Sequence, residues 1–185
     1  PIHTPIITNR DIRAVVKTLE EGQVSGRAPI VAEFENAFAT FLGVKYAIAV
    51  SSGTAALHVA MQAVGISRKD KVIEPALTMM STAFAANYLG AEILPADVEN
   101  DYWCIDPAAV SRALKRKPKA ILAVHLYGIP ARVDLLKDIA KTKGVVLLED
   151  CSEALGAQIS NRLVGTFGDA ATFSFFSNKL ITTCL

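Results

Sequence analysis

The sequence predicts an α/β fold in which a mostly parallel sheet is covered by helices on both faces. Short apolar runs recur along the chain without the polar and apolar alternation of half-exposed strands. A segment of helical length separates most of these runs from the next one. Strands that are apolar throughout are buried on both sides, so helices are expected on both faces of the sheet. The 185 residues suffice for one domain with a sizeable core.

Each element follows from a local pattern. Apolar residues recur at helical spacing before Gly22, a favourable helix end, at Ile12, Val15, Val16 and Leu19. The segment "PIVAEFENAFATFLG" predicts a second helix that ends at Gly43. Further helices are predicted at residues 54–64, 80–89, 107–115 and 132–142. Strands are predicted at residues 45–50, 71–75, 91–98, 119–126, 144–151 and 170–176, with a looser stretch before the last one.

Composition excludes several classes of protein. The formal net charge is +1, which gives no sign of a nucleic-acid partner, and the basic run "KRKPK" (115–119) is expected to be a solvated turn. Cys104, Cys151 and Cys184 are too few and too scattered for a disulfide framework or a metal site. The sequence has neither about 18 uninterrupted apolar residues nor a signal-peptide pattern at its start. We therefore expect a soluble cytoplasmic protein that does not contact membranes.

Polar residues follow the predicted strands, where ligand sites of parallel sheets lie. "SSGTAAL" (51–57) places hydroxyl groups and a glycine at the start of a helix. The free N–H groups and the helix dipole at such a start suit a phosphate, although ordinary helix capping by serine explains the same residues. The segment is neither a dinucleotide fingerprint nor a P-loop, so a nucleotide-binding domain of the Rossmann type is disfavoured.

Two acids and a lysine complete the candidate site. Asp150 ends an apolar strand, so as a buried charge it needs a cationic or hydrogen-bonding partner. Alternatively, it only caps the next segment. Glu153, three residues further on, could reach the same place. Lys179 follows an aromatic run; it is either a surface lysine or a desolvated amine that attacks carbonyls. His125 ends a strand nearby, either packed or in contact with a ligand. A phosphate cradle, an acid and a lysine together match the needs of pyridoxal 5'-phosphate.

The ordered set of motifs resembles the DegT/StrS-type sugar aminotransferases, which are fold-type I pyridoxal-phosphate enzymes. The motifs include "SSGTAALHVAMQAVGI", "VIEPALTMMSTAFAANYLGAEILPADV", "EDCSEALGA" and "VGTFGDAATFSFFSNK", and the resemblance covers residues 5–183. The stretches "FSFFSNKLITT" and "NDYWCIDP" are most similar to the perosamine-synthase branch, whose substrate is GDP-4-keto-6-deoxymannose.

The resemblance implies roles for individual residues. Lys179 would form the Schiff base with the cofactor aldehyde and move the proton during transamination, whereas a histidine there would indicate the related dehydratases. Asp150 would pair with the pyridine nitrogen, and Glu153, where the family more often has Gln or His, would approach the phenolic oxygen. The residues implied to bind the phosphate are Gly53, Thr54, Ala55 and Ser174. Met79 stands where the family usually has an aromatic residue that stacks on the cofactor ring.

The resemblance also implies a larger molecule. After "ITT" (181–183) the family continues with a glycine-rich motif, a strand that lies between the first strand and the lysine strand, and a small domain. We therefore expect residues 1–43 to form an N-terminal arm with helices, and residues 44–185 an incomplete cofactor-binding domain. The unpaired edges of 45–50 and 170–176 would favour aggregation.

The expected function is transfer of an amino group from L-glutamate to a keto group of a nucleotide-linked deoxysugar, in a homodimer. The alternative is a catalytically inactive remnant or interaction module of the same family.

Overall fold

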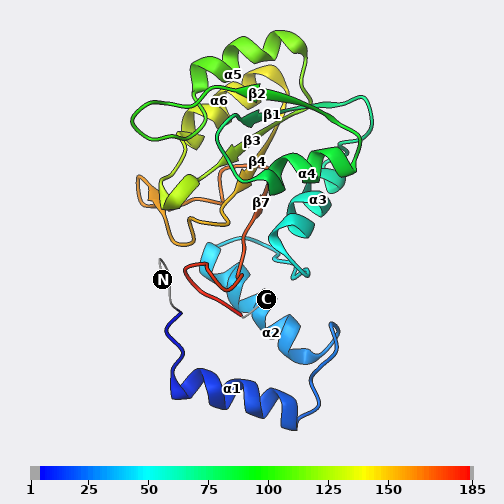
Figure 1. Cartoon of the computed structure of the whole chain (residues 1–185), viewed down its shortest axis with the longest axis vertical. Helices are drawn as coiled ribbons and strands as arrows, with labels where there is room; N and C mark the ends of the chain where they lie inside the picture. The colour runs from blue at the N-terminus through cyan, green and yellow to red at the C-terminus, as the bar shows by residue number, and fades with distance from the viewer. Residues whose placement is uncertain (1–4, 184–185) are drawn as a thin grey trace. The chain divides into compact units, whose positions relative to one another are not determined.

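The computed structural model describes residues 5–183; three helices come first, and helices then alternate with strands as far as β4 (Figure 1). The helices are α1 (Asn9–Glu20), α2 (Pro29–Leu42), α3 (Gly53–Ala63), α4 (Met80–Tyr88), α5 (Pro107–Ala113) and α6 (Val133–Lys143), with 3-10 turns η1 (Leu114–Arg116) and η2 (Leu126–Gly128). The strands are β1 (Lys71–Pro75), β2 (Glu92–Ala96), β3 (Ala120–Val124), β4 (Val146–Asp150), β5 (Gln158–Ile159), β6 (Arg162–Leu163) and β7 (Ala170–Thr172).

The main sheet has the strand order β2-β1-β3-β4-β7, and every neighbouring pair is parallel. Val124 of β3 is level with Asp150 of β4, which is level with Thr172 of β7. The carboxyl ends of these three strands therefore meet at one edge. The short strands β5 and β6 form an antiparallel pair within the stretch that was expected to be loose.

Helices cover both faces of this sheet, as Figure 1 shows. Ile121 and Leu147 lie in one buried cluster together with residues of α5 and α6. Leu122 and Leu148, the next residues along the same strands, lie in a second cluster with residues of α3 and α4. Successive side chains of a strand point to opposite faces, so an uninterrupted apolar strand supplies both clusters. The predicted fold class is confirmed.

Local signals explain where the helices begin and end. Thr8 caps α1 through a capping box: its hydroxyl accepts the Asp11 N–H while Asp11 accepts the Thr8 N–H. α2 ends at Gly43, whose φ of 69° lies in the left-handed region that favours glycine. The four helices predicted between residues 54 and 142 all form within two residues of their expected ends.

The predicted strand at residues 45–50 is wrong, because the structure has no strand there. A strand needs a neighbour that accepts and donates its backbone hydrogen bonds. The N–H of Ala49 instead donates to Oε1 of Glu35 at 2.8 Å. Tyr46 and Ile48 are 73% and 77% exposed. The last strand is also shorter than predicted, since β7 ends at Thr172.

The chain divides into two compact units, one up to Val50 and one from Ser51 onward. The domain boundary expected after residue 43 and the expected incompleteness of the second domain stay predictions. The sheet and all the elements from α3 to β7 belong to the second unit.

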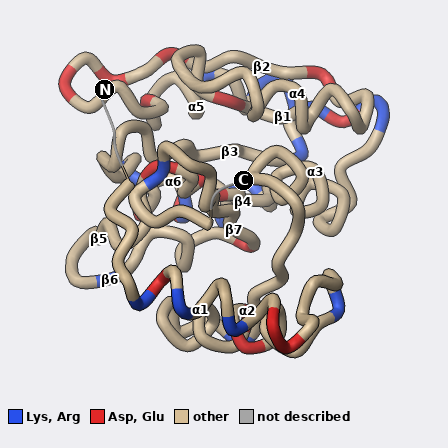
Figure 2. Tube along the Cα trace, turned by 60° about the horizontal axis from the view of Figure 1, so that its bottom comes forward, with Lys and Arg blue, Asp and Glu red and all other residues tan. Residues whose placement is uncertain are grey.

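Figure 2 shows acidic and basic residues interspersed along the trace. Cys104 and Cys151 are buried free thiols, whereas Cys184 lies outside the described residues. Among the helices of residues 5–183, none is both long and apolar enough to cross a membrane.

Candidate functional site

The start of α3 forms one side of the candidate site. Ser52 caps the helix, and its Oγ accepts the Ala55 N–H at 3.1 Å. The first N–H groups of a helix, here those of Gly53 and Thr54, have no acceptor inside the helix. A Cβ at residue 53 would lie 3.2 Å from the Cβ of Ser174 and 3.5 Å from its Oγ, a tight contact that glycine avoids. The structure thus brings Ser174 against the first turn of α3.

Asp150 lies at the carboxyl end of β4 and is 4% exposed. Its Oδ1 accepts the N–H of Ser152 at 3.0 Å. Burial raises the pKa of Asp150, while hydrogen bonds from the side chain and then the backbone of Ser152, and the positive charge of Lys179, oppose the rise. A buried carboxyl group of this kind is stabilised as a carboxylate by any further positive charge placed against it.

Lys179 and Glu153 form an ion pair close to Asp150. The Nζ of Lys179 lies 3.5 Å from Oε1 of Glu153, and the two side chains are 16% and 23% exposed. Oε2 of Glu153 accepts the N–H of Tyr127 at 2.9 Å, which orients the carboxylate toward the lysine. Lys179 itself follows β7 by seven residues, so the aromatic run delivers it to the same edge as Asp150.

Met79 is the N-cap residue of α4 and is 60% exposed. Its expected place on the face of a cofactor ring stays a prediction. Thr78, immediately before it, has a buried hydroxyl oxygen that has no hydrogen-bond partner among the described residues.

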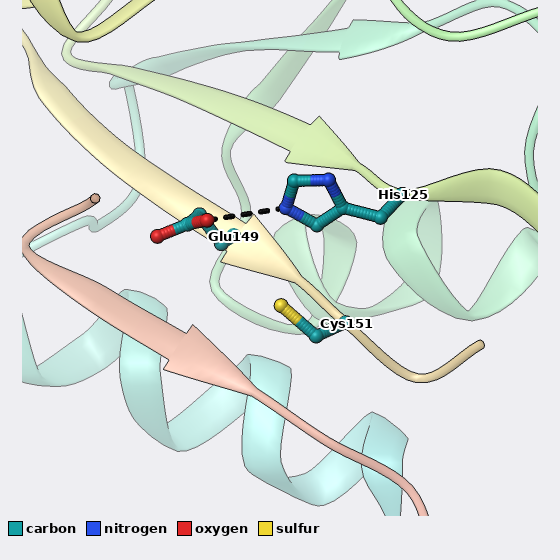
Figure 3. Close-up of side chains that lie close together, drawn as sticks. All are labelled: His125, Glu149 and Cys151. Atoms are coloured by element: carbon teal, nitrogen blue, oxygen red, sulfur yellow. Dashed lines mark hydrogen bonds and ion pairs between the residues drawn. The ribbon is translucent and has the colours of Figure 1, made fainter. Parts of the chain in front are cut away.

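His125 lies beside Asp150 in the sheet, where its backbone N–H donates to the carbonyl oxygen of Asp150 at 3.0 Å. The ring is fully buried; Nδ1 accepts the N–H of Ala131 at 3.0 Å, so Nε2 carries the proton and donates to Oε2 of Glu149 at 3.1 Å. Figure 3 shows His125 and Glu149 turned toward each other, with Cys151 beside them. The packed histidine is confirmed, and a contact between His125 and a ligand stays a prediction.

Glu149 explains why this buried cluster is stable. Besides His125, its carboxylate accepts the N–H groups of Gly165, Phe167 and Gly168 at 2.7 to 2.8 Å. Burial alone would raise the pKa of Glu149, but these hydrogen bonds together lower it. His125, Glu149 and Cys151 have ligand atoms within 4.8 Å of one another. Since both ring nitrogens and both carboxylate oxygens are engaged in hydrogen bonds, the cluster is a structural network rather than a metal site.

Sequence reasoning missed two residues near the site. Ser152 lies with its Oγ 3.4 Å from where a Cβ of Gly53 would stand, an approach between positions about 100 apart in the chain. Glu74, at the end of β1, is 2% exposed, and its Oε1 has no hydrogen-bond partner among the residues that the structure describes. Burial, and then the charge of Asp150, raise the pKa of Glu74 to about 7. The acid within the apolar run "KVIEP" was the only signal for this residue.

Two curated relatives cover nearly the whole chain. The GDP-perosamine synthase of Escherichia coli O157:H7 is 40% identical over 183 residues, which are 99% of this chain and 50% of that protein. The GDP-perosamine synthase of Vibrio cholerae is 39% identical over the same shares. The chain therefore spans about half the length of these relatives.

Solved structures share the fold. An aminotransferase from Psychrobacter cryohalolentis superposes with a TM-score of 0.93 at 33% identity, over 97% of this chain and 46% of that chain. The E. coli GDP-4-keto-6-deoxy-D-mannose-3-dehydratase with bound hydrated PLP superposes with a TM-score of 0.92 at 29% identity, over 98% and 48% of the two chains. A variant of GDP-4-keto-6-deoxymannose-3-dehydratase with bound GDP-perosamine gives 0.91 at 28% identity, over 98% and 48%.

A family model decides the assignment. The model of the DegT/DnrJ/EryC1/StrS aminotransferase family matches residues 5–184, which is nearly the whole sequence. The TM-scores of 0.91 to 0.93 show that the fold agrees with that of the superposed structures. The chain belongs to the DegT/DnrJ/EryC1/StrS aminotransferase family.

Proposed function

We propose that the chain carries the cofactor site of a pyridoxal-phosphate-dependent aminotransferase that acts on a nucleotide-linked keto sugar. The observation that carries the proposal is the convergence of Lys179, Glu153 and Asp150 at one edge of the sheet. The cradle of Gly53 and Ser174 is linked to the same place through Ser152, which contacts both Asp150 and the start of α3. Family membership alone would not predict that these residues are intact.

The described residues fit the cofactor at both of its ends. Ser174 packs closely against Gly53 at a helix start, where free backbone N–H groups and a neighbouring serine hydroxyl group suit a phosphate. Asp150 is buried and its pKa is raised, so it gains from a positively charged ring nitrogen against it. When bound, the cofactor supplies an electron sink for the carbon at which the amino group is exchanged.

Each side chain then has a defined task. Gly53 and Thr54 offer backbone N–H groups to the phosphate, and Ser174 offers its hydroxyl. The Asp150 carboxylate holds a proton at the ring nitrogen. Nζ of Lys179 takes the proton from the α-carbon of L-glutamate, and Glu153 keeps Nζ within 3.5 Å of its carboxylate. Met79 offers a flexible apolar surface in place of an aromatic ring.

The proposed net reaction moves an amino group. L-glutamate leaves as 2-oxoglutarate, and the amino group replaces the keto oxygen of the sugar. The names of the two relatives support GDP-4-keto-6-deoxymannose as the acceptor. Two of the superposed structures are dehydratases, so the fold does not separate the two reactions. The lysine at residue 179 favours amino transfer over dehydration. We also propose that the enzyme acts as a homodimer.

The test is an absorbance titration of the purified chain with pyridoxal 5'-phosphate, followed by borohydride reduction and peptide mapping. We expect a visible absorbance band and a reduced adduct on the peptide that contains Lys179. Lys179→Ala should abolish both, and Lys115→Ala, at an exposed lysine, should leave both unchanged. In a separate, unreduced sample of the unaltered chain, addition of L-glutamate should bleach the band.

One result would favour the inactive alternative. A chain that is folded by circular dichroism, yet gives no more adduct at Lys179 than at Lys115, would not carry a working cofactor site. The family assignment would stand, and the chain would then be an inactive relative.

A further inference from the structure

Glu74 is a buried acid on the same face of the sheet as Asp150. Ile73 of β1 is level with Ile121 of β3, which is level with Leu147 of β4, and these three side chains lie in the cluster with α5 and α6. Successive side chains of a strand alternate between the two faces. Glu74 directly follows Ile73, so its side chain points to the opposite face, toward α3 and α4. Asp150 lies three residues after Leu147 and therefore points to that face as well.

One carboxyl oxygen of Glu74 is buried without a partner. The residue is 2% exposed, and Oε1 has no hydrogen-bond partner among the residues that the structure describes. Glu149, an equally buried acid on the other face, accepts hydrogen bonds from four donors. A hydrogen-bond network of that kind does not account for Glu74. A buried polar group that structure leaves unexplained, beside a candidate site, is a candidate for a functional role.

Asp150 is the charged group that acts on Glu74. Burial, and then the charge of Asp150, raise the pKa of Glu74. The helices that cover this face carry two other titratable side chains, His58 on α3 and Tyr88 on α4. Their rings pack against each other with centroids 5.7 Å apart, and Tyr88 is 64% exposed. The two acids therefore repel each other when both are ionised.

The remaining elements bring one further charge to this region. By the same alternation, the described strands of the main sheet place no titratable side chain on this face besides the two acids. Lys179, in the segment after β7, opposes the rise in the pKa of Asp150. A positive charge placed near Asp150 thus offsets the repulsion between Asp150 and Glu74.

We propose that Glu74 is a positioning residue that acts through Asp150 on the ring nitrogen of the cofactor. Before the cofactor binds, the two acids share one negative charge. A cationic ring against Asp150 cancels part of the repulsion, so Glu74 releases its proton to solvent and becomes a second carboxylate near the ring. The inference rests on the proposed function, because it takes the cofactor from there.

The sign of the pH dependence follows from this arrangement. At pH 5 Glu74 is protonated and adds no charge, because its pKa is about 7. As the pH rises through 7, its carboxylate adds to the attraction for a cationic ring. Ligand affinity and proton release are linked, so a ligand that lowers the pKa of Glu74 binds more tightly once Glu74 is ionised.

The experiment uses pyridoxine 5'-phosphate, which has the ring nitrogen and the phosphate of the cofactor but a hydroxymethyl group in place of the aldehyde. It therefore binds without reacting with Lys179. Its affinity is measured by calorimetry from pH 5 to 8 for the unaltered chain, Glu74→Gln and Glu74→Met. Glu33→Gln is the matched control, because Glu33 is exposed on α2. Thermal unfolding checks that each variant is folded at each pH.

We expect the unaltered chain and Glu74→Gln to bind equally at pH 5, and the unaltered chain to bind about three- to tenfold more tightly at pH 8. The titration of the ligand itself cancels in this ratio of affinities. In buffers of different ionisation enthalpy at pH 7, the unaltered chain should release more protons on binding than Glu74→Gln. Glu74→Met should behave like Glu74→Gln, and Glu33→Gln like the unaltered chain.

Three results would contradict these expectations. Equal affinities of the unaltered chain and both Glu74 variants from pH 5 to 8 overturn the role of Glu74 and leave the proposed function standing. A difference in affinity that does not change with pH shows that Glu74 acts through packing, which also overturns the inference. An unaltered chain that binds no pyridoxine 5'-phosphate at any pH overturns the proposed function, and the role of Glu74 falls with it.

Discussion

Glu149 is a fully buried carboxylate whose oxygens accept four hydrogen bonds, one from His125 and three from backbone N–H groups. Glu149→Gln puts an amide donor opposite some of these donors and leaves buried N–H groups without an acceptor. We expect the free energy of unfolding to fall by about 2 to 4 kcal/mol, because each buried donor left without an acceptor costs about 1 to 3 kcal/mol. Urea unfolding measures this change.

The control for this substitution is Glu33→Gln on the exposed side of α2, which should change the free energy of unfolding by less than about 0.5 kcal/mol. A loss of similar size in the two variants would mean that the Glu149 network does not contribute to stability beyond an ordinary surface charge.

The connection between β6 and β7 depends on a glycine at residue 165. Gly165 has a φ of 85°, and a Cβ there would lie 2.4 Å from Cζ of Phe173 and 3.3 Å from Sγ of Cys151. Gly144, which ends α6, also has a positive φ, but a Cβ there meets open space. A side chain at residue 144 would therefore add backbone strain alone, whereas a side chain at residue 165 would add both backbone strain and steric overlap.

We expect Gly144→Ala to lower the free energy of unfolding by about 1 kcal/mol, the cost of a left-handed conformation. Gly165→Ala should cost about 1 to 3 kcal/mol more, because the ring of Phe173 has to move. Thermal or urea unfolding measures the loss of free energy of unfolding in each of the two variants. Equal losses would show that the Phe173 ring gives way without cost.

The dependence of whole-molecule stability on pH follows from the buried acids. Glu74 has a pKa of about 7 in the folded chain and an ordinary pKa of 4.5 when unfolded. A raised pKa means that the folded state prefers the protonated acid, so its stability is fully present below about pH 4.5 and is lost as the pH rises through 7. Glu149, with its lowered pKa, acts in the opposite sense, but only at acidic pH.

Glu74→Gln should therefore be more stable than the unaltered chain at pH 8, by up to about 3 kcal/mol, and the difference should shrink toward zero near pH 5. Glutamine imitates the protonated acid and does not ionise. Urea unfolding at four pH values from 5 to 8 measures the difference, with Glu33→Gln as a variant that should show none. If the difference in free energy of unfolding between the two chains did not change with pH, the pKa of Glu74 would be ordinary in the folded chain, as for a carboxyl group in contact with water.

The sequence by itself determined the sheet, the flanking helices and the roles suggested for Lys179, Asp150 and Ser174. Helical and strand periodicity, glycine helix ends and capping residues act within a few residues, so they can be read locally. The candidate site was predictable to the extent that its residues follow strand ends in order along the chain.

Only the tertiary structure decided which of these residues meet. The approach of Ser152 to Gly53, the pairing of His125 with Glu149 and the burial of Glu74 beside Asp150 join segments far apart in the sequence. Residues 45–50 have the composition of a strand yet form none, because a strand also needs a neighbour that pairs with its backbone. Hydrogen-bond partners and burial are properties of packing, and local pattern does not specify them.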